Sequence, residues 1–169
     1  SIDKTIWLIF NGEIYNYKEL REQLILKGYK FKTKTDTEII INAYLEYGED
    51  CVKKFNGMFA FSLWDEKNKK FFAARDRIGI KPYYYYASSK VFVFASEIKS
   101  ILLHPEVKKE PNDDAISNYL LFDHPINNQT WFKDIYALEP GSYLTIKNNQ
   151  IKRTKYWEID FNIDYERSY

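Results

Sequence analysis

The sequence predicts an α+β domain in which antiparallel sheets and helices form separate layers. Three observations lead to this fold class. Two helical patterns precede a run of strand patterns, the strands come in hairpin pairs, and aromatic residues are abundant, with 12 Phe, 15 Tyr and 4 Trp among 169 residues. Because helices and strands are segregated along the chain, an alternating βαβ arrangement is disfavoured. The length suits one domain with a substantial core.

The first predicted element is a strand over residues 6–10. Its five residues are all apolar and leave no polar face, so we expect the strand to be buried on both sides. Asn11 and Gly12 then form a tight turn. A side-chain amide and a bare backbone N–H at a strand end are two donors that suit a developing oxyanion. Such turns are most often structural, but Glu13 and a helix follow, so polar groups converge here.

Two helices come next, each opened by a capping pattern and closed by a glycine. An Asn or Thr followed three residues later by Glu marks the starts at Asn16 and Thr35, and Gly28 and Gly48 mark the ends. Asp36 is predicted to be the first residue inside the second helix. Its carboxylate either interacts with the helix dipole or holds a substrate ammonium, and the residues alone favour the dipole.

The pattern then changes to strands. Two hairpins, over residues 58–74 and 83–95, predict four antiparallel strands in meander order. Short helices are expected at 97–103 and 113–122. A last hairpin over 143–156 precedes a polar tail.

Composition excludes several classes of function. The 25 basic and 24 acidic residues nearly cancel and are dispersed, so nucleic acid is not an expected partner. No apolar run approaches the roughly 18–20 residues that span a bilayer, and the start has no secretion signal. We therefore expect a soluble, cytoplasmic protein with no membrane contact. The single cysteine, Cys51, agrees with a reducing compartment and is expected to be a buried, unreactive thiol.

Other polar residues have plainer interpretations. The run Arg75-Asp76-Arg77 follows a strand and is expected to form an ion-pair network that fixes a loop. His104 and His124 each precede a proline, so both are expected in loops without a catalytic or metal-binding role. No metal site is predicted.

Six segments together resemble the glutaminase domain of class II glutamine amidotransferases, specifically that of the glutamine-hydrolysing asparagine synthetases. They occur in the family's order and extend over residues 10 to about 157. The segments are residues 10–16 (FNGEIYN), 35–38 (TDTE), 55–61 (FNGMFAF), 74–84 (ARDRIGIKPYY), 94–99 (FASEIK) and 138–141 (LEPG).

This resemblance implies an Ntn-hydrolase-like αββα sandwich, with two antiparallel sheets flanked by helices. Asn11 and Gly12 match the family's oxyanion-hole pair, which is catalytic and contacts the substrate. Glu13 and Asp36 match residues that bind the substrate glutamine, Asp36 through its α-ammonium group. The resemblance therefore reverses the preference for a dipole role at Asp36.

The family's nucleophile is an N-terminal cysteine whose own α-amine serves as the base. That cysteine and the arginine that binds the glutamine α-carboxylate belong to a segment upstream of the Asn-Gly pair that these residues do not include. Neither Ser1 nor Cys51 matches the nucleophile. We therefore expect residues 1–160 to be an incomplete glutaminase domain without turnover of its own. Residues 161–169 are expected to be a linker toward an ATP-dependent synthetase domain.

The resemblance implies no cofactor for this chain, and ATP with Mg²⁺ for the synthetase domain. The expected partners are glutamine and a covalently linked synthetase domain, with a homodimer as a further option. Two alternatives stay open. One is a non-catalytic module that binds an amino acid or a protein, and the other is a glutaminase domain that serves a different acceptor.

Overall fold

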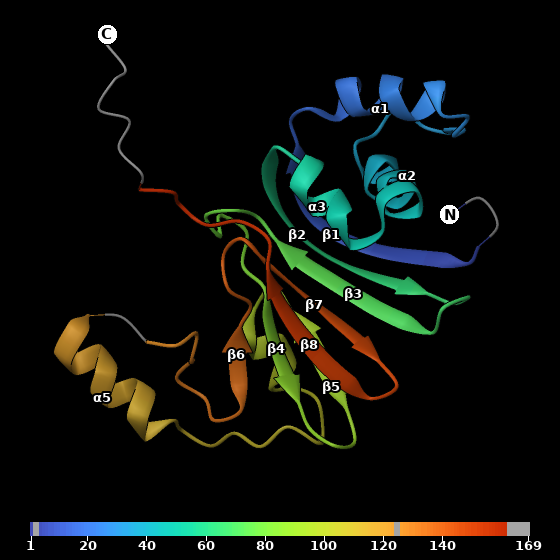
Figure 1. Cartoon of the computed structure of the whole chain (residues 1–169). Coiled ribbons are helices and arrows are strands. Elements are labelled where there is room, and N and C mark those ends of the chain that lie inside the picture. The colour runs from blue at the N-terminus through green and yellow to red at the C-terminus, as the bar shows by residue number, and fades with distance from the viewer. Residues whose placement is uncertain (2–3, 124–125, 162–169) are drawn as a thin grey trace, which may run out of the picture.

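The computed structural model describes residues 1, 4–123 and 126–161, and it confirms the α+β fold (Figure 1). Two antiparallel sheets are stacked face to face. Within these residues, sheet A has the strand order β1-β2-β3-β7-β8 and sheet B has the order β5-β4-β6. Sheet A consists of β1 (Ile6–Ile14), β2 (Gly57–Asp65), β3 (Lys70–Arg75), β7 (Ser142–Lys147) and β8 (Gln150–Lys155). Sheet B consists of β4 (Tyr84–Ala87), β5 (Phe92–Ala95) and β6 (Ile135–Ala137).

Helices lie on the outer faces of both sheets, which gives the expected αββα order of layers. The outer face of sheet A is covered by α1 (Tyr17–Leu26), α2 (Thr37–Tyr47), the short 3₁₀ turn η1 (Gly48–Asp50) and α3 (Cys51–Lys54). The outer face of sheet B packs against α4 (Ile98–Ile101). The last helix, α5 (Asp113–Phe122), projects to one side of sheet B (Figure 1).

Three apolar clusters hold these layers together. One lies between the helices and sheet A, one between the two sheets, and one behind sheet B. Their buried members include, in that order, Ile40 and Phe72, Tyr83 and Leu144, and Ile101 and Ile135. Aromatic rings contribute heavily, as the composition predicts: the ring centroids of Phe61 and Phe72 lie 5.4 Å apart in an edge-to-face arrangement.

Strand β1 differs from its prediction in length and in burial. It continues to Ile14, so Asn11 and Gly12 lie inside the strand and pair with β2 instead of forming a turn. Its residues alternate between the two faces, and Trp7 and Ile9 are 61% and 67% exposed. The prediction of a strand buried on both sides is wrong because β1 is the edge strand of sheet A, and the three described strands of sheet B leave this part of its face uncovered.

The predicted helices lie where the sequence places them, whereas η1 and α3 were not predicted, and the starts of α1 and α2 are held differently. Neither capping box forms. The carboxamide of Asn16 donates to the Lys54 carbonyl and accepts from the Asn56 N–H, both at 2.9 Å, and so joins the start of α1 to the end of α3. Helix α2 begins at Thr37, and Asp36 occupies the preceding N-cap position without capping the helix by its side chain.

Gly28 and Gly48 end α1 and α2 as predicted, with φ of 91° and 59°. The predicted hairpins also form, but their meander order is wrong. Strand β3 pairs with β7, whereas β4 pairs with β5 and β6 in the other sheet. The chain crosses from sheet A to sheet B between residues 75 and 84, a change of layer that strand periodicity cannot reveal.

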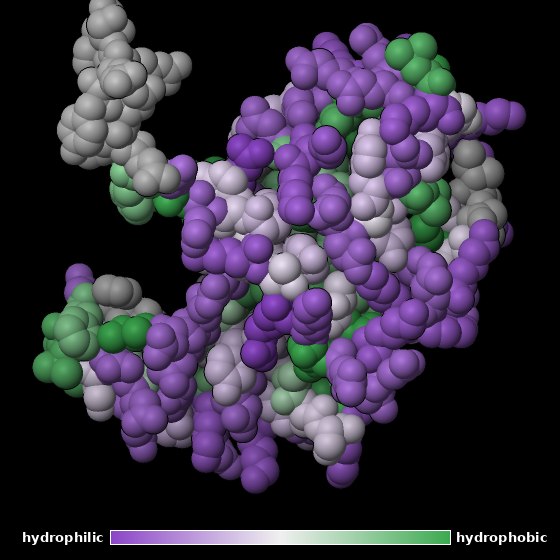
Figure 2. All heavy atoms as spheres, in the orientation of Figure 1, coloured by the Kyte–Doolittle hydropathy of each residue, from purple (hydrophilic) through white to green (hydrophobic). Residues whose placement is uncertain are grey.

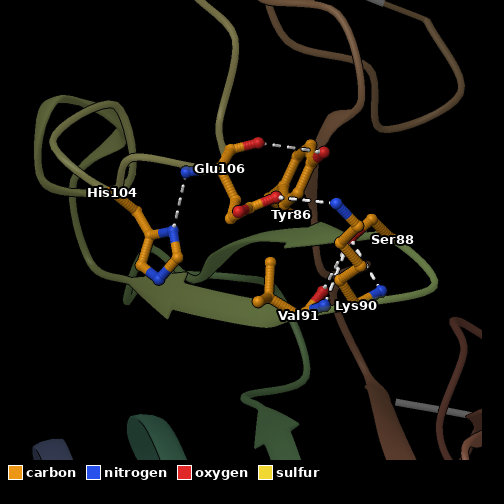
Figure 3. Close-up of polar contacts among 6 residues, drawn as sticks. All are labelled: Tyr86, Ser88, Lys90, Val91, His104 and Glu106. Atoms are coloured by element: carbon orange, nitrogen blue, oxygen red, sulfur yellow. Dashed lines mark hydrogen bonds and ion pairs between the residues drawn. The ribbon is translucent and has the colours of Figure 1, made fainter.

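The turn between β4 and β5 is held against the loop that follows α4 (Figure 3). The Tyr86 hydroxyl donates to the Glu106 carbonyl at 3.5 Å, and the Lys90 ammonium lies 3.7 Å from the Glu106 carboxylate. His104 Nδ1 accepts from the Glu106 N–H at 3.3 Å, which gives this histidine a structural contact in its loop. His124 lies outside the described residues.

Helix α5 has an apolar surface exposed to solvent. Leu120, Leu121 and Phe122 are largely exposed and form the green area over α5 at the lower left of Figure 2. The opposite contacts of the helix include the buried Ala115 and Tyr119, whose ring centroid lies 5.0 Å from that of Trp131. In the part of the chain that the structure describes, no helix has the length and apolar character required to cross a membrane.

Asp65, at the end of β2, connects α2 to the turn between β2 and β3. It is buried, and its carboxylate accepts hydrogen bonds from the Tyr44 hydroxyl at 3.1 Å and from Asn68 Nδ2 at 2.7 Å and backbone N–H at 3.0 Å. Burial acts to raise the pKa of this carboxyl, but the hydrogen bonds from Asn68 and Tyr44 outweigh it and hold the pKa below its usual value.

We expect Asp65→Asn to remove part of the acid sensitivity of folding. Since the pKa is lower in the folded state, ionised Asp65 stabilises the fold above about pH 4, and this contribution is lost as pH falls through the folded pKa. Urea unfolding at several pH values between about 7 and 3 should show a stability difference between wild type and variant that shrinks toward acid. A difference that stays constant with pH would contradict this role.

Candidate active site at the open edge of β1

The backbone N–H of Gly12 points away from the sheet at the open edge of β1. Hydrogen bonds from Tyr15 N to the Asn56 carbonyl and from Glu66 N to the Thr5 carbonyl fix which residues of β1 bond to β2. In an antiparallel ladder these positions alternate, so odd-numbered residues of β1 bond to β2 and even-numbered ones face outward. The N–H of Gly12 is therefore not used by β2 and can donate to a group that binds along the free edge of β1.

The same edge receives Asp36 from the start of α2. Asp36 Oδ2 accepts a hydrogen bond from the Ile14 N–H at 3.0 Å, and Ile14 is the next outward-facing residue after Gly12. Two residues along a strand span about 7 Å. The fold thus brings a carboxylate from α2 beside the outward N–H of Gly12, although the two are distant in sequence.

The side chain of Asn11 lies on the face of β1 that is turned toward sheet B. Its Nδ2 donates to Ser96 Oγ at 3.3 Å, directly after β5. Both residues line a cavity of about 230 Å³ between the sheets, whose other walls include Tyr83 and Phe94. Glu13, two residues further along, lies on the same face as Asn11 and is exposed.

Glycine is required on both strands at this point. A Cβ on Gly12 would lie 2.1 Å from the Met58 carbonyl oxygen, and one on Gly57 would lie 2.2 Å from the Glu13 carbonyl oxygen. Gly12 also has a φ of 147°. The close backbone approach of β1 and β2 therefore sets the position of the Gly12 N–H.

Within the described residues, no cysteine thiol lies beside Asn11 and Gly12. Cys51 is fully buried in the core between the helices and sheet A, and burial raises the pKa of its thiol, so the prediction of a buried, unreactive cysteine is confirmed. Ser1 contacts the other end of β1, where its Oγ accepts from the Ile6 N–H at 2.9 Å. Five strand residues, roughly 17 Å, separate Ile6 from Asn11.

The expected ion-pair network at Arg75-Asp76-Arg77 is wrong in its chemistry, although the loop is fixed as predicted. Arg75 and Asp76 bind backbone groups instead of each other. The Arg75 guanidinium donates to the carbonyls of Gly79, Lys81 and Leu138, all within 2.8 Å. Burial lowers the pKa of Arg75 relative to its ordinary value, with the charge of Asp76 opposing that change.

Asp76 is fully buried and organises the crossover between the sheets. Its carboxylate accepts from the backbone N–H groups of Phe59 at 3.2 Å, Ile80 at 2.9 Å and Lys81 at 3.0 Å. Phe59 is the β2 residue opposite Gly12. The buried Asp76 carboxylate therefore holds β2 in place at the point where β2 pairs with Gly12 of β1.

The sequence places three of the four predicted site residues next to one another, and the fold adds the fourth, Asp36. Their roles stay predictions. Sequence reasoning missed Ser96 and Gly57, although both lie in segments that carry the family resemblance. No group of three or more His, Cys, Asp or Glu side chains within the described ranges is arranged to hold a metal ion.

Several known proteins are similar to this chain in sequence or in fold. Residues 1–157 match a family model described as a glutamine amidotransferase domain. The chain is 39% identical over 157 residues to glutamine-hydrolysing asparagine synthetase 3 of Bacillus subtilis, an alignment that includes 92% of the chain and 26% of the relative. It is 39% identical over 167 residues to putative glutamine-hydrolysing asparagine synthetase 2 of Methanocaldococcus jannaschii, with 96% of the chain and 32% of the relative included.

A solved structure shares the fold. Glutamine phosphoribosylpyrophosphate amidotransferase from Bacillus subtilis aligns with a TM-score of 0.61 at 20% sequence identity, over 94% of this chain and 30% of that one. The chain thus spans about a quarter to a third of the length of these three proteins. Because the family match extends over residues 1–157, this chain belongs to the glutamine amidotransferase domain family.

Proposed function

We propose that these residues are part of the glutaminase domain of an asparagine synthetase, which hydrolyses glutamine to glutamate and ammonia. The ammonia serves the ATP-dependent amidation of aspartate. The observation that carries this proposal is the arrangement at the edge of β1, where the Asn11 amide and the outward Gly12 N–H lie beside the carboxylate of Asp36.

Asn11 and Gly12 act as the oxyanion donors. When a nucleophile attacks the side-chain carboxamide of glutamine, the carbonyl oxygen gains negative charge, which Asn11 Nδ2 and the Gly12 N–H stabilise. Such donors act mainly in the transition state, and the loss of one costs about 2.7–4 kcal/mol of its stabilisation. The rigid β1–β2 contact keeps the Gly12 donor in place before substrate arrives.

Asp36 and Glu13 bind the other end of glutamine. Asp36 Oδ2 is held by the Ile14 N–H, and its second oxygen makes no hydrogen bond within the described part of the chain. That oxygen takes the α-ammonium of the substrate, and the exposed Glu13 carboxylate supplies a further contact. A fixed carboxylate on one side and the oxyanion donors on the other orient glutamine across the edge of β1.

The nucleophile is a cysteine thiolate that lies outside these 169 residues. Its sulfur forms a bond to the carboxamide carbon, and the C–N bond breaks as ammonia leaves with a proton from the cysteine's amino group. Water then hydrolyses the γ-glutamyl thioester to glutamate and returns the thiol. Residues 1–169 alone are therefore expected to release no ammonia from glutamine.

The wider protein carries the remaining steps. A covalently linked synthetase domain that uses ATP and Mg²⁺ activates aspartate, residues 161–169 lead toward that domain, and the protein acts in the cytoplasm, with a homodimer as its proposed assembly. The linked synthetase domain is supported by the identity of about two-fifths to asparagine synthetases, whose chains are three to four times as long.

The test is Asn11→Ala in the natural polypeptide that contains these residues. We expect its kcat for ammonia release from glutamine to fall about 100- to 1000-fold, because one oxyanion donor is lost. Asn118→Ala on α5, well away from β1, serves as the matched control and should retain wild-type activity. Asparagine formation from aspartate, ATP and glutamine is measured in parallel.

The outcomes separate the alternatives. Glutamine binding without hydrolysis by the wild-type polypeptide would support the non-catalytic module instead. Hydrolysis without asparagine formation would support a glutaminase domain that serves a different acceptor. Hydrolysis that is unaffected by Asn11→Ala would refute the assignment of the oxyanion donor.

A further inference from the structure

We propose that Ser96 is a positioning residue that orients the carboxamide of Asn11 for its role as an oxyanion donor. This inference rests on the proposed glutaminase function. It starts from the hydrogen bond between Asn11 Nδ2 and Ser96 Oγ, 3.3 Å long, which joins the edge strand of sheet A to the end of β5 in sheet B. The two residues are 85 positions apart in the sequence.

Ser96 itself is exposed, but the strand that precedes it is anchored between the sheets. Ser96 follows β5 directly, and the Phe94 ring of that strand stacks on Tyr83 with centroids 5.8 Å apart and contacts Phe71 of sheet A at 5.3 Å. Phe71 belongs to the same sheet as Asn11. The aromatic contacts between the sheets therefore fix how far Ser96 lies from Asn11.

An asparagine carboxamide needs such a contact to act as a defined donor. Rotation of the terminal amide is broad, so an unsupported side chain samples many orientations of its N–H groups and exchanges its oxygen and nitrogen. When Ser96 Oγ accepts one hydrogen of Nδ2, the plane of the amide is set. The second hydrogen of the same nitrogen then has a fixed direction and is left for the substrate oxygen.

The cavity beside this pair supports the same interpretation. Its walls are largely apolar where Ile9, Ala60 and Phe94 line it, so they offer no polar group to the Asn11 amide. The hydroxyl groups of Ser62 and Tyr83, which also line the cavity, bond to each other at 2.8 Å. Among the hydroxyl groups of the described residues that line this cavity, the one that accepts a hydrogen bond from the Asn11 amide is that of Ser96.

The experiment compares Ser96→Ala, Ser96→Thr and Ser100→Ala in the natural polypeptide that contains these residues. We expect Ser96→Ala to lower kcat for glutamine hydrolysis about 3- to 10-fold, the effect of one neutral hydrogen bond, with KM unchanged because Ser96 does not contact glutamine. Ser96→Thr keeps the hydroxyl and should restore most of kcat. Ser100→Ala, an exposed serine on α4, should have no effect.

A double-variant comparison makes the test specific. In the Asn11→Ala background, Ser96→Ala should cause no further loss, because the amide it orients is gone. A kcat loss of the same size in both backgrounds would overturn the proposal, and so would a wild-type kcat in Ser96→Ala while Asn11→Ala is impaired. If Asn11→Ala itself has full activity, the proposed function fails first, so the two failures are distinguishable.

Discussion

Gly12→Ala is expected to disrupt the pairing of β1 with β2 and, in the longer polypeptide that contains these residues, to abolish the proposed glutamine hydrolysis. The new Cβ would lie 2.1 Å from the Met58 carbonyl oxygen and 2.7 Å from the Phe59 Cα, both of them backbone atoms that cannot rotate away. The φ of 147° adds strain for any residue with a side chain. Overpacking and backbone strain together predict a loss of about 3–5 kcal/mol in the free energy of unfolding.

Gly28→Ala is the matched control for this variant. Gly28 also has a positive φ, 91°, but a Cβ there would meet no atom within 4 Å. It should lose only about 1–2 kcal/mol, through backbone strain alone. Urea unfolding compares the two stabilities, and hydrogen exchange over residues 6–14 and 57–65 reports the strand pairing directly. Equal losses in both variants would show that the close approach of β1 and β2 is absent.

The Asn11-Gly12 pair shows how far sequence reasoning reaches at this site. A polar dipeptide after five apolar residues makes this position a candidate, but the local pattern assigns it to a turn. The structure extends the strand through both residues to Ile14, because β2 supplies a partner for each of them. The donor at Gly12 faces outward because β1 is an edge strand, and edge position is a property of the assembled sheet.

Asp36 and Ser96 show why the rest of the site needs the fold. Neither lies near Asn11 in sequence, and each reaches β1 from a different layer: Asp36 from the helices outside sheet A, Ser96 from sheet B. Periodicity predicts the elements that carry them but not how these elements are stacked. The family resemblance points to Asp36 because it carries information from relatives, whereas Ser96 enters only through its hydrogen bond to Asn11 in the folded chain.

The crossover after β3 illustrates the same limit for the fold. The hairpins were predicted correctly because each depends on local alternation and a short turn. Their meander order was wrong because the chain changes layer at residues 76–83, where the charged run was interpreted as an ion-pair network. A buried carboxylate that binds backbone N–H groups leaves no periodic signal, and Asp76 is such a residue.

Asp76→Ala is expected to destabilise the fold by about 3–6 kcal/mol, because it leaves three backbone N–H groups without their charged acceptor. In a regular ladder the Phe59 N–H would bond to a backbone carbonyl of the next strand. Here the Asp76 N–H still donates to the Phe59 carbonyl at 2.8 Å, but the Asp76 carboxylate takes the return bond. Because the side chain takes this bond in place of the Asp76 backbone carbonyl, that carbonyl accepts from the Gly141 N–H instead, also at 2.8 Å.

Asp50→Ala provides the control, since Asp50 pairs with Lys53 at the surface and is largely exposed. Exposed pairs of this kind contribute about 0–1 kcal/mol. Urea unfolding of both variants should therefore separate them by several kcal/mol, and Asp76→Asn, which keeps one acceptor oxygen, should fall between them. Because Phe59 lies opposite Gly12, Asp76→Asn should also lower kcat for the proposed glutamine hydrolysis, measured on folded protein of the longer polypeptide. If Asp76→Ala is as stable as Asp50→Ala, the Asp76 carboxylate does not hold the crossover. The expected effect of Asp76→Asn on kcat, which depends on that role, would then also be refuted.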